Sequence, residues 1–212
     1  LMPRPDYERF VASFGKGNGS RYRCLCHKEG AKGDRFVHFF AKVEDTHTKS
    51  LQGKGCDYDF GLNIDIFPMD GKPEEPDIQR KRERRLTHWS HRLNICGTRF
   101  DLLNFHQPLF SKLEAHVMGA EYWWKKINSE VLKYPYETSR LAGAVSVTYN
   151  GTREIFEKSM LEEYSEIEFE GCYFKAFSRW DEWLTQEFGD YMILPPEKDR
   201  KTHDLTVFLL DN

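Results

Sequence analysis

The clearest structural signal in the sequence is an alternating segment, residues 56–67, that a proline follows. Every second position is apolar, and the intervening positions are acidic, amide or glycine. The apolar set is Cys56, Tyr58, Phe60, Leu62, Ile64 and Ile66, and the other set is Asp57, Asp59, Gly61, Asn63 and Asp65. Because successive side chains of a strand point to opposite faces, this pattern predicts a strand with one face toward a core. Pro68 cannot donate a ladder hydrogen bond, so we expect the strand to stop there.

Helical periodicity replaces this alternation from Pro76 onward. We predict helices over residues 77–96, over 108–132 with an interruption near Gly119, over 152–164, and over 178–188, where Ser178 and Asp181 match a capping box and Gly189 suits the C-terminal cap. Nearer the start, residues 7–14 have helical spacing, and residues 22–25, 35–43 and 144–149 have strand composition. The pattern predicts an α+β fold, with mixed strands first and mostly helices after.

Composition excludes some functional classes. The 212 residues carry a net charge of −3, which gives no general case for binding nucleic acid. No apolar run approaches the roughly 18 residues of a membrane span, and no signal peptide is visible. The five cysteines are odd in number and irregularly spaced, which favours a reducing, cytoplasmic compartment. Cys24 and Cys26 with His27 suggest zinc, but no second pair follows at finger-like spacing.

Asp65 is the strongest candidate for chemistry, because its neighbours Ile64, Ile66 and Phe67 favour burial. A carboxylate in an apolar strand is costly unless it is paired, hydrogen-bonded or bound to a cation. The alternative is that Asp65 lies on the solvent face or accepts backbone N–H groups at the Pro68 turn. Asp70, in a Met-Asp-Gly run, is read as ordinary turn chemistry.

Three further sets of residues have a functional and a structural interpretation. The basic run of residues 80–85 could meet phosphates or an anionic membrane surface, or it could be a solvated helix face. The aromatic groups Trp89, Tyr122-Trp123-Trp124 and Trp180/Trp183 could cage a quaternary ammonium, with Trp89 and Trp123 slightly favoured, or they could lie in the core. Lys42 could reach a phosphate, or its stem could pack while its amine meets solvent.

Taken together, the motifs resemble the LicD family. Residues 2–7, MPRPDY, are similar to the family's MPR-x-DY, and residues 40–45, FAKVED, with Thr48, continue the likeness. Residues 63–71, NIDIFPMDG, resemble the family's IDIFPLDG most strongly. Residues 169–171, FEG, and 189–196, GDYMILPP, follow, and then Arg200 and His203. Residues 76–141 carry little of the family pattern.

The resemblance implies a nucleotidyltransferase-like mixed sheet flanked by helices, in which three carboxylates hold Mg²⁺ against the phosphates of a nucleotide. It maps the third carboxylate onto Asp65. The segment that should carry the other two, GTLLGAxRHxGFIPWDDDxDI, does not occur in this sequence, so the remaining metal ligands are expected upstream of Leu1 and the chain by itself is expected to be inactive. One LicD-like domain is expected over residues 1–212: 1–72 as the remaining part of the catalytic core, 76–142 as a helical region, and 143–212 as a C-terminal strand and helices.

The implied activity is transfer of a phospho-alcohol, phosphocholine from CDP-choline first, to a hydroxyl of a cell-surface glycan of the lipopolysaccharide or teichoic acid type. Arg4, Lys42, Arg200 and His203 are the expected phosphate contacts. Asp65 would bind the metal or accept the proton of the acceptor hydroxyl. The expected location is cytoplasmic, with peripheral contact at the inner face of the membrane. Two alternatives remain: a ribitol- or glycerol-phosphate transferase of the same fold, which uses a related CDP-alcohol, and a non-catalytic fragment.

Overall fold

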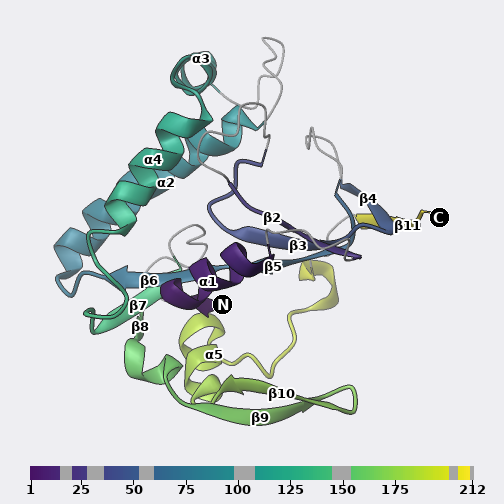
Figure 1. Cartoon of the computed structure of the whole chain (residues 1–212). Helices are drawn as coiled ribbons and strands as arrows, with labels where there is room; N and C mark the ends of the chain where they lie inside the picture. The colour runs from purple at the N-terminus through teal and green to yellow at the C-terminus, as the bar shows by residue number, and fades with distance from the viewer. Residues whose placement is uncertain are drawn as a thin grey trace.

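The computed structural model describes residues 1–14, 21–27, 36–52, 60–97, 108–144, 154–200 and 205–210. Its elements form the α+β fold that the sequence predicts. Strands run across the middle of the molecule in Figure 1. Helices α2, α3 and α4 lie above them, and α5 lies below with the hairpin of β9 and β10.

Two sheets meet at Phe67. A four-stranded sheet has the order β1 (Met2–Pro3), β6 (Pro68–Lys72), β7 (Leu141–Ala144), β8 (Phe156–Glu157), with β1 parallel to β6 and the other pairs antiparallel. A three-stranded antiparallel sheet has the order β2 (Tyr22–Leu25), β3 (Ala41–Asp45), β5 (Asn63–Ile66). The chain leaves the second sheet at the end of β5 and enters the first at β6.

Two smaller strand pairs complete the sheets. Strand β4 (Thr48–Gln52) pairs antiparallel with β11 (Leu205–Leu209). Strands β9 (Tyr164–Phe169) and β10 (Cys172–Phe177) form a hairpin. Glu170 and Gly171 connect them with positive φ angles of 51° and 77°, the backbone that a tight two-residue hairpin turn requires.

The alternating segment is only partly the strand that its pattern predicts. Residues 53–59 lie outside the described residues, and β5 spans Asn63–Ile66. On the expected core face, Leu62 is 49% exposed and Ile64 is 65% exposed, so the prediction that they are buried is wrong. The reason is that β5 is an edge strand, and the apolar cluster around α1 takes in Ile66 but not Ile64.

Pro68 has a different role from the predicted one. The strand does end before it, at Ile66, but Pro68 is itself the first residue of β6, and all five residues of β6 are buried. A proline is tolerated as the first residue of a strand, because the missing N–H lies at the end of the ladder. Pro68 therefore marks the change from one sheet to the other.

The helices agree with the periodicity in most places. They are α1 (Arg4–Phe14), α2 (Pro76–Cys96), α3 (Leu109–Met118), α4 (Ala120–Val131) and α5 (Trp180–Phe188), with two 3₁₀ turns, η2 (Lys158–Leu161) and η3 (Glu197–Asp199). The break at Gly119 is confirmed, and its φ of 78° explains it, because that backbone conformation suits glycine. Gly189, also with positive φ, ends α5 as predicted.

Two local predictions are wrong and one is partly testable. The helix over 152–164 is replaced, in its described part, by β8 and η2, because Phe156 pairs with Ala142 in the sheet and is 2% exposed. The Ser178 capping box does not form: Arg179 is the N-cap, and the Ser178 amide instead donates to the Glu163 carbonyl. The strand predicted over 144–149 appears earlier as β7, and residues 145–150 lie outside the described part.

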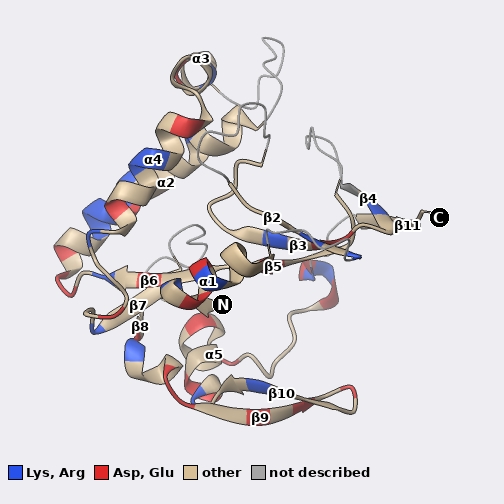
Figure 2. Ribbon diagram, in the orientation of Figure 1, with Lys and Arg blue, Asp and Glu red and all other residues tan. Residues whose placement is uncertain are grey.

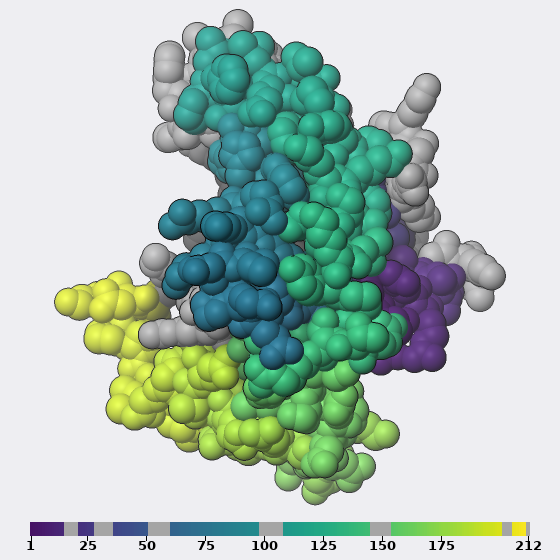
Figure 3. Space-filling view, turned by 90° about the vertical axis from the view of Figure 1, so that its left-hand side faces the viewer, coloured from purple at the N-terminus to yellow at the C-terminus, as the bar shows by residue number. Residues whose placement is uncertain are grey.

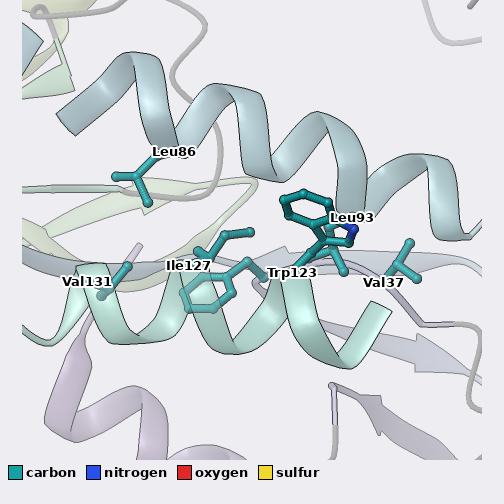
Figure 4. Packing of buried hydrophobic residues seen from close by; sticks show 7 residues of the cluster. Val37, Leu86, Leu93, Trp123, Ile127 and Val131 are labelled. Atoms are coloured by element: carbon teal, nitrogen blue, oxygen red, sulfur yellow. The ribbon is translucent and has the colours of Figure 1, made fainter. Parts of the chain in front are cut away.

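The largest apolar cluster joins α2 to α4. Leu86 and Leu93 of α2 meet Trp123, Ile127 and Val131 of α4, and each of these side chains is at most 3% exposed. Figure 4 shows the two helices side by side with these side chains between them, and Figure 3 shows the outer surface of the pair. A second cluster, which includes Met69, Ala142 and Phe156, fills the space between the four-stranded sheet and α5.

Candidate functional site

Strands β3 and β5 place Lys42 beside Asp65. The two residues are partners in the antiparallel register, so their side chains share one face of the three-stranded sheet. The Lys42 Nζ donates to Asp65 Oδ1 at 2.5 Å and to Asn63 Oδ1 at 3.1 Å. Asn63 and Asp65 are the polar positions of the alternating segment, so this face carries a polar cluster.

Aromatic rings surround the stem of Lys42. Its Nζ lies 5.4 Å from the ring centre of Phe40 and 5.2 Å from that of Phe60, which is within cation–π distance. The lysine side chain is 10% exposed, and the Asp65 side chain is 34% exposed. The sequence-based alternative, a packed stem with an amine directed to a polar surface, agrees with this position.

The partial exposure of Asp65 changes the argument made for it from sequence. Asp65 does not sit in an apolar environment, because its carboxylate faces Lys42 at the border of the sheet. Its charge therefore needs no metal ion to explain it. What the geometry offers is a half-exposed carboxylate held next to an ammonium.

His38 is a third polar group at this place. Its ring stacks on Phe40 with 4.8 Å between centroids. The pKa of His38 is lowered to about 4, mainly by burial and also by the nearby positive charge of Lys42, while Asp65 partly opposes the shift. His38 is therefore neutral at pH 7, and Lys42 is the cation of the cluster of His38, Lys42 and Asp65.

Arg4 lies in a different environment from the one predicted. Its Nε and Nη2 donate to Asp70 Oδ1 and Oδ2 at 2.7 and 2.6 Å. The guanidinium also lies 5.2 Å from the ring centre of Tyr7 and 5.6 Å from that of Phe39. This buried, bidentate pair fixes the start of α1 to β6, so the geometry gives Arg4 a structural partner and lends no support to a phosphate contact.

Asp70 is the residue that the sequence interpretation missed. It was assigned to a turn, but it lies in β6 and is 2% exposed. The signal that could have revealed it is the run of residues 68–72, in which a charge stands between buried neighbours. Sequence also gives no signal for His38, since one histidine between Val37 and Phe39 forms no pattern of its own.

The two tryptophans proposed as a choline cage belong to the helical layer. Trp123 is 3% exposed and packs in the cluster between α2 and α4, which agrees with the alternative that it is a core residue. Trp89 is half-buried against the same cluster, and the Lys126 amine already lies 5.0 Å from its ring centre. The structure therefore does not bring either ring to the Lys42–Asp65 pair.

The remaining predicted contacts are at the C-terminal end. Arg200 is exposed and its Nε donates to the Pro195 carbonyl at 2.9 Å. His203 lies outside the described residues. The basic run of α2 is also largely paired: Arg80 contacts Asp77, Arg85 contacts Glu130, and Arg82 is 1% exposed. Figure 2 shows acidic and basic residues interspersed on α2 and α4.

The described residues offer no cluster of metal ligands. Within them, no group of three or more His, Cys, Asp and Glu side chains could hold a metal ion. Cys24 and Cys26 are buried and not joined in a disulfide, and His27 stacks on Trp124 and contacts Glu121. In the same part of the chain, no helix has the length and apolar character of a membrane span.

One curated protein is similar to nearly the whole chain. The chain is 29% identical to the lipopolysaccharide cholinephosphotransferase LicD of Haemophilus influenzae over 219 residues, which covers 96% of this chain and 76% of that protein. This similarity supports the resemblance of the chain to the LicD family. No family model matches it, and no solved structure matches it. Because the alignment covers 96% of the chain, the polar cluster on β3 and β5 lies inside it.

Proposed function

We propose that this LicD-like protein transfers phosphocholine from CDP-choline to a hydroxyl of a cell-surface glycan, of the lipopolysaccharide or teichoic acid type. The observation that carries the proposal is the 29% identity to a lipopolysaccharide cholinephosphotransferase over 96% of the chain. A related CDP-alcohol, such as CDP-ribitol or CDP-glycerol, is the alternative donor.

Lys42 is the group proposed to receive the donor's diphosphate. Its ammonium is held by Asp65 and Asn63 at the border of the sheet, and two aromatic rings fix its stem. A phosphate oxygen can replace one of these two acceptors without moving the strand. A cation placed at the reacting phosphorus stabilises the negative charge that develops during transfer.

Asp65 is the proposed acceptor of the hydroxyl proton. When the Lys42 ammonium turns toward the donor phosphate, the half-exposed Asp65 carboxylate loses its partner and can act as the base for the acceptor hydroxyl. The acceptor oxygen then forms a bond to the phosphorus that carries choline, the bond from that phosphorus to the CMP oxygen breaks, and CMP leaves. The hydroxyl proton moves to Asp65. His38, which is neutral, adds no competing positive charge.

Mg²⁺ remains a prediction of the family resemblance. Among the described residues the one carboxylate at the proposed site is Asp65, and it contacts Lys42, so these residues do not by themselves fit a magnesium site. Hydrated Mg²⁺ is usually held by one or two carboxylates together with substrate phosphates. For this reason the steps above use only the protein's own side chains.

The fold and the location are part of the same proposal. We propose that the mixed sheets are a nucleotidyltransferase-like core in a single domain over residues 1–212, with the boundaries given above. Two features support this core. Strands β1 and β6 pair in parallel, and β5, the strand that carries Asp65, leads directly into β6. We place the reaction in the cytoplasm at the inner face of the membrane, and the absence of a disulfide at Cys24 and Cys26 is consistent with a reducing compartment.

The test is a transfer assay with a choice of donors. The 212-residue chain, and the same chain preceded by the family's GTLLGAxRHxGFIPWDDDxDI segment, are incubated with Mg²⁺, a lipopolysaccharide acceptor and CDP-choline, CDP-ribitol or CDP-glycerol. Mass spectrometry of the glycan then shows which phospho-alcohol has been added. We expect phosphocholine with the second form. No transfer from any donor by either form would refute the proposal.

Lys42→Met gives the residue-level test. Methionine keeps the packed stem and removes the ammonium, so donor affinity should fall by about 10-fold, the equivalent of roughly 1.4 kcal/mol. Lys175→Met is the matched control, since Lys175 is an exposed residue of β10. Equal effects of the two substitutions would remove Lys42 from the site.

A further inference from the structure

A polar cleft of about 490 Å³ lies between the turn that joins β6 to α2 and the loop that joins α4 to β7. Residues 72–75 line one wall, and residues 133–135 and 138–140 line the other. All of them except Pro73 and Pro135 carry a charge or a hydroxyl group. Figure 1 shows the two connections together at the left-hand side of the molecule, where the start of α2 and the end of α4 approach β6 and β7. Ligand pockets commonly have volumes of about 300–1,000 Å³, so the cleft is large enough for a ligand.

Hydrogen bonds and close packing hold both walls of the cleft in place. The side-chain amide of Gln79, a buried residue of α2, donates to the Pro73 carbonyl at 2.5 Å. On the other wall, Ser139 Oγ donates to the Pro135 carbonyl at 2.8 Å. Gly71 lets the walls come together, because a Cβ at that position would collide with the Ser139 side chain. A ligand therefore meets a cleft that is already formed, which lowers the entropic cost of binding.

The exposed charges of the cleft pair with one another. Arg140 Nε donates to Glu74 Oε2 at 3.0 Å, which links the two walls, and Arg140 Nη1 contacts Glu157. Lys133 Nζ donates to Glu130 Oε2 at 2.7 Å. The side chains of Arg140 and Lys133 are 56% and 59% exposed. Ion pairs at such exposed positions contribute little to stability, so a ligand can replace one of these contacts at small cost.

This balance of charge favours a neutral ligand that is rich in hydroxyl groups. An anion in the cleft would lie beside the carboxylates of Glu74 and Glu75, and a cation would lie beside Lys133 and Arg140. A hydroxyl group both donates and accepts, so it can bond to a carboxylate and to an ammonium or guanidinium at once. A sugar ring carries several such groups, and its apolar face can pack on Tyr134 and the prolines of the lining.

The length of β6 separates the cleft from the Lys42–Asp65 pair. Lys72, at the end of β6, follows Asp65 by seven residues, so the two Cα atoms lie within about 25 Å of each other. Strand β6 itself accounts for roughly 13 Å of that path. A ligand in the cleft is therefore not the group that receives the phosphorus. It is a part of the acceptor that lies further along the same molecule.

We propose that this cleft binds sugar residues of the acceptor glycan at a distance from the hydroxyl that reacts. Glu75, Lys133 and Arg140 form hydrogen bonds with the sugar hydroxyls, and Tyr134 packs on the face of a ring. The inference rests on the proposed function for the identity of the acceptor. Its consequence is that a long glycan binds more tightly than a short one.

The test measures glycan binding by the 212-residue chain itself. The lipid-free oligosaccharide of a lipopolysaccharide, the same oligosaccharide after removal of its phosphate groups, and inorganic phosphate are titrated by calorimetry. The proteins are the wild type, Arg140→Met, Glu75→Gln and the control Arg80→Met, which changes an exposed, ion-paired arginine of α2 outside the cleft. We expect each cleft variant to weaken both oligosaccharides by about 10-fold, because a hydrogen bond to a charged group is lost. Arg80→Met should bind like the wild type.

Several outcomes would overturn the glycan cleft. They are absence of oligosaccharide binding by the wild type, loss of binding when the phosphate groups are removed, competition by inorganic phosphate, or an equal effect of Arg80→Met. Glu75→Gln keeps the side-chain shape, so it remains informative if Arg140→Met does not fold. Oligosaccharide binding that the cleft variants weaken, without transfer, would support the cleft and count against the proposed function. Transfer of phosphocholine with an unchanged KM for the glycan in Arg140→Met and Glu75→Gln would overturn the cleft alone.

Discussion

The buried pair of Arg4 and Asp70 gives the most specific stability prediction. Arg4→Met removes the guanidinium and leaves the Asp70 carboxylate, 2% exposed, without its bidentate partner. Removal of one member of a buried ion pair typically costs about 3–5 kcal/mol. We expect a loss of about 3 kcal/mol, the lower end of this range. The reason is that Lys72 and Arg82 also lie near Asp70, whose negative charge raises the pKa of both, so its carboxylate keeps positive charges nearby.

This magnitude sets the expected shift in melting temperature. A chain of this size loses about 2–4 °C for each kcal/mol, so Arg4→Met should melt roughly 6–12 °C lower. The double variant Arg4→Met, Asp70→Leu should recover most of the loss, because an apolar pair of similar volume can replace a buried ion pair at little cost. Thermal unfolding followed by circular dichroism measures both shifts.

Asp77→Asn is the matched control for this experiment. The Asp77 side chain is 79% exposed and its pair with Arg80 lies on the surface of α2, so its removal should change stability by less than about 1 kcal/mol. A melting temperature of Arg4→Met equal to that of the control Asp77→Asn would refute the structural role of the Arg4–Asp70 pair. A double variant no more stable than Arg4→Met would refute it as well.

Three further predictions concern single residues. Because burial holds the pKa of His38 near 4, below its unfolded value of 6.5, the free energy of unfolding should fall by up to about 3 kcal/mol between pH 6.5 and pH 4. Urea titrations of His38→Gln should lack that part of the pH dependence. Trp123→Ala should cost about 3–5 kcal/mol as a core deletion, and calorimetry should show no selective loss of CDP-choline over CDP-glycerol. Arg200→Ala should lower the transfer rate with an unchanged melting temperature, whereas a large drop in that temperature would make Arg200 a structural anchor.

Periodicity predicted the helices well because their packing is local and regular. The stripe of Leu86, Trp89 and Leu93 is the face that meets α4, and Gly119 breaks the next helical run where its backbone requires glycine. Strand composition likewise predicted β2, but only the end of the strand expected over residues 35–43 is observed, since β3 begins at Ala41. These features depend on residues close together in the chain.

The errors concern contacts between distant segments. Asp70 looked like a turn residue because its partner Arg4 lies 66 positions away. The exposure of Ile64 follows from how far the α1 cluster extends over the sheet, which no pattern within the segment contains. The same limit applies to the tryptophans: their aromatic character suggested a cage, but only the packing of α2 on α4 places Trp123 in the core.

Asp65→Asn in the transfer assay tests the central claim most directly, because it keeps the shape of the side chain and removes the charge. The comparison uses the form that carries the family's upstream segment, with CDP-choline, a lipopolysaccharide acceptor and a Mg²⁺ titration. We predict that turnover falls by at least about 100-fold, an effect of the size expected for loss of a general base, while the melting temperature stays the same or rises. Wild-type turnover by Asp65→Asn would contradict the assignment of the site to Lys42 and Asp65.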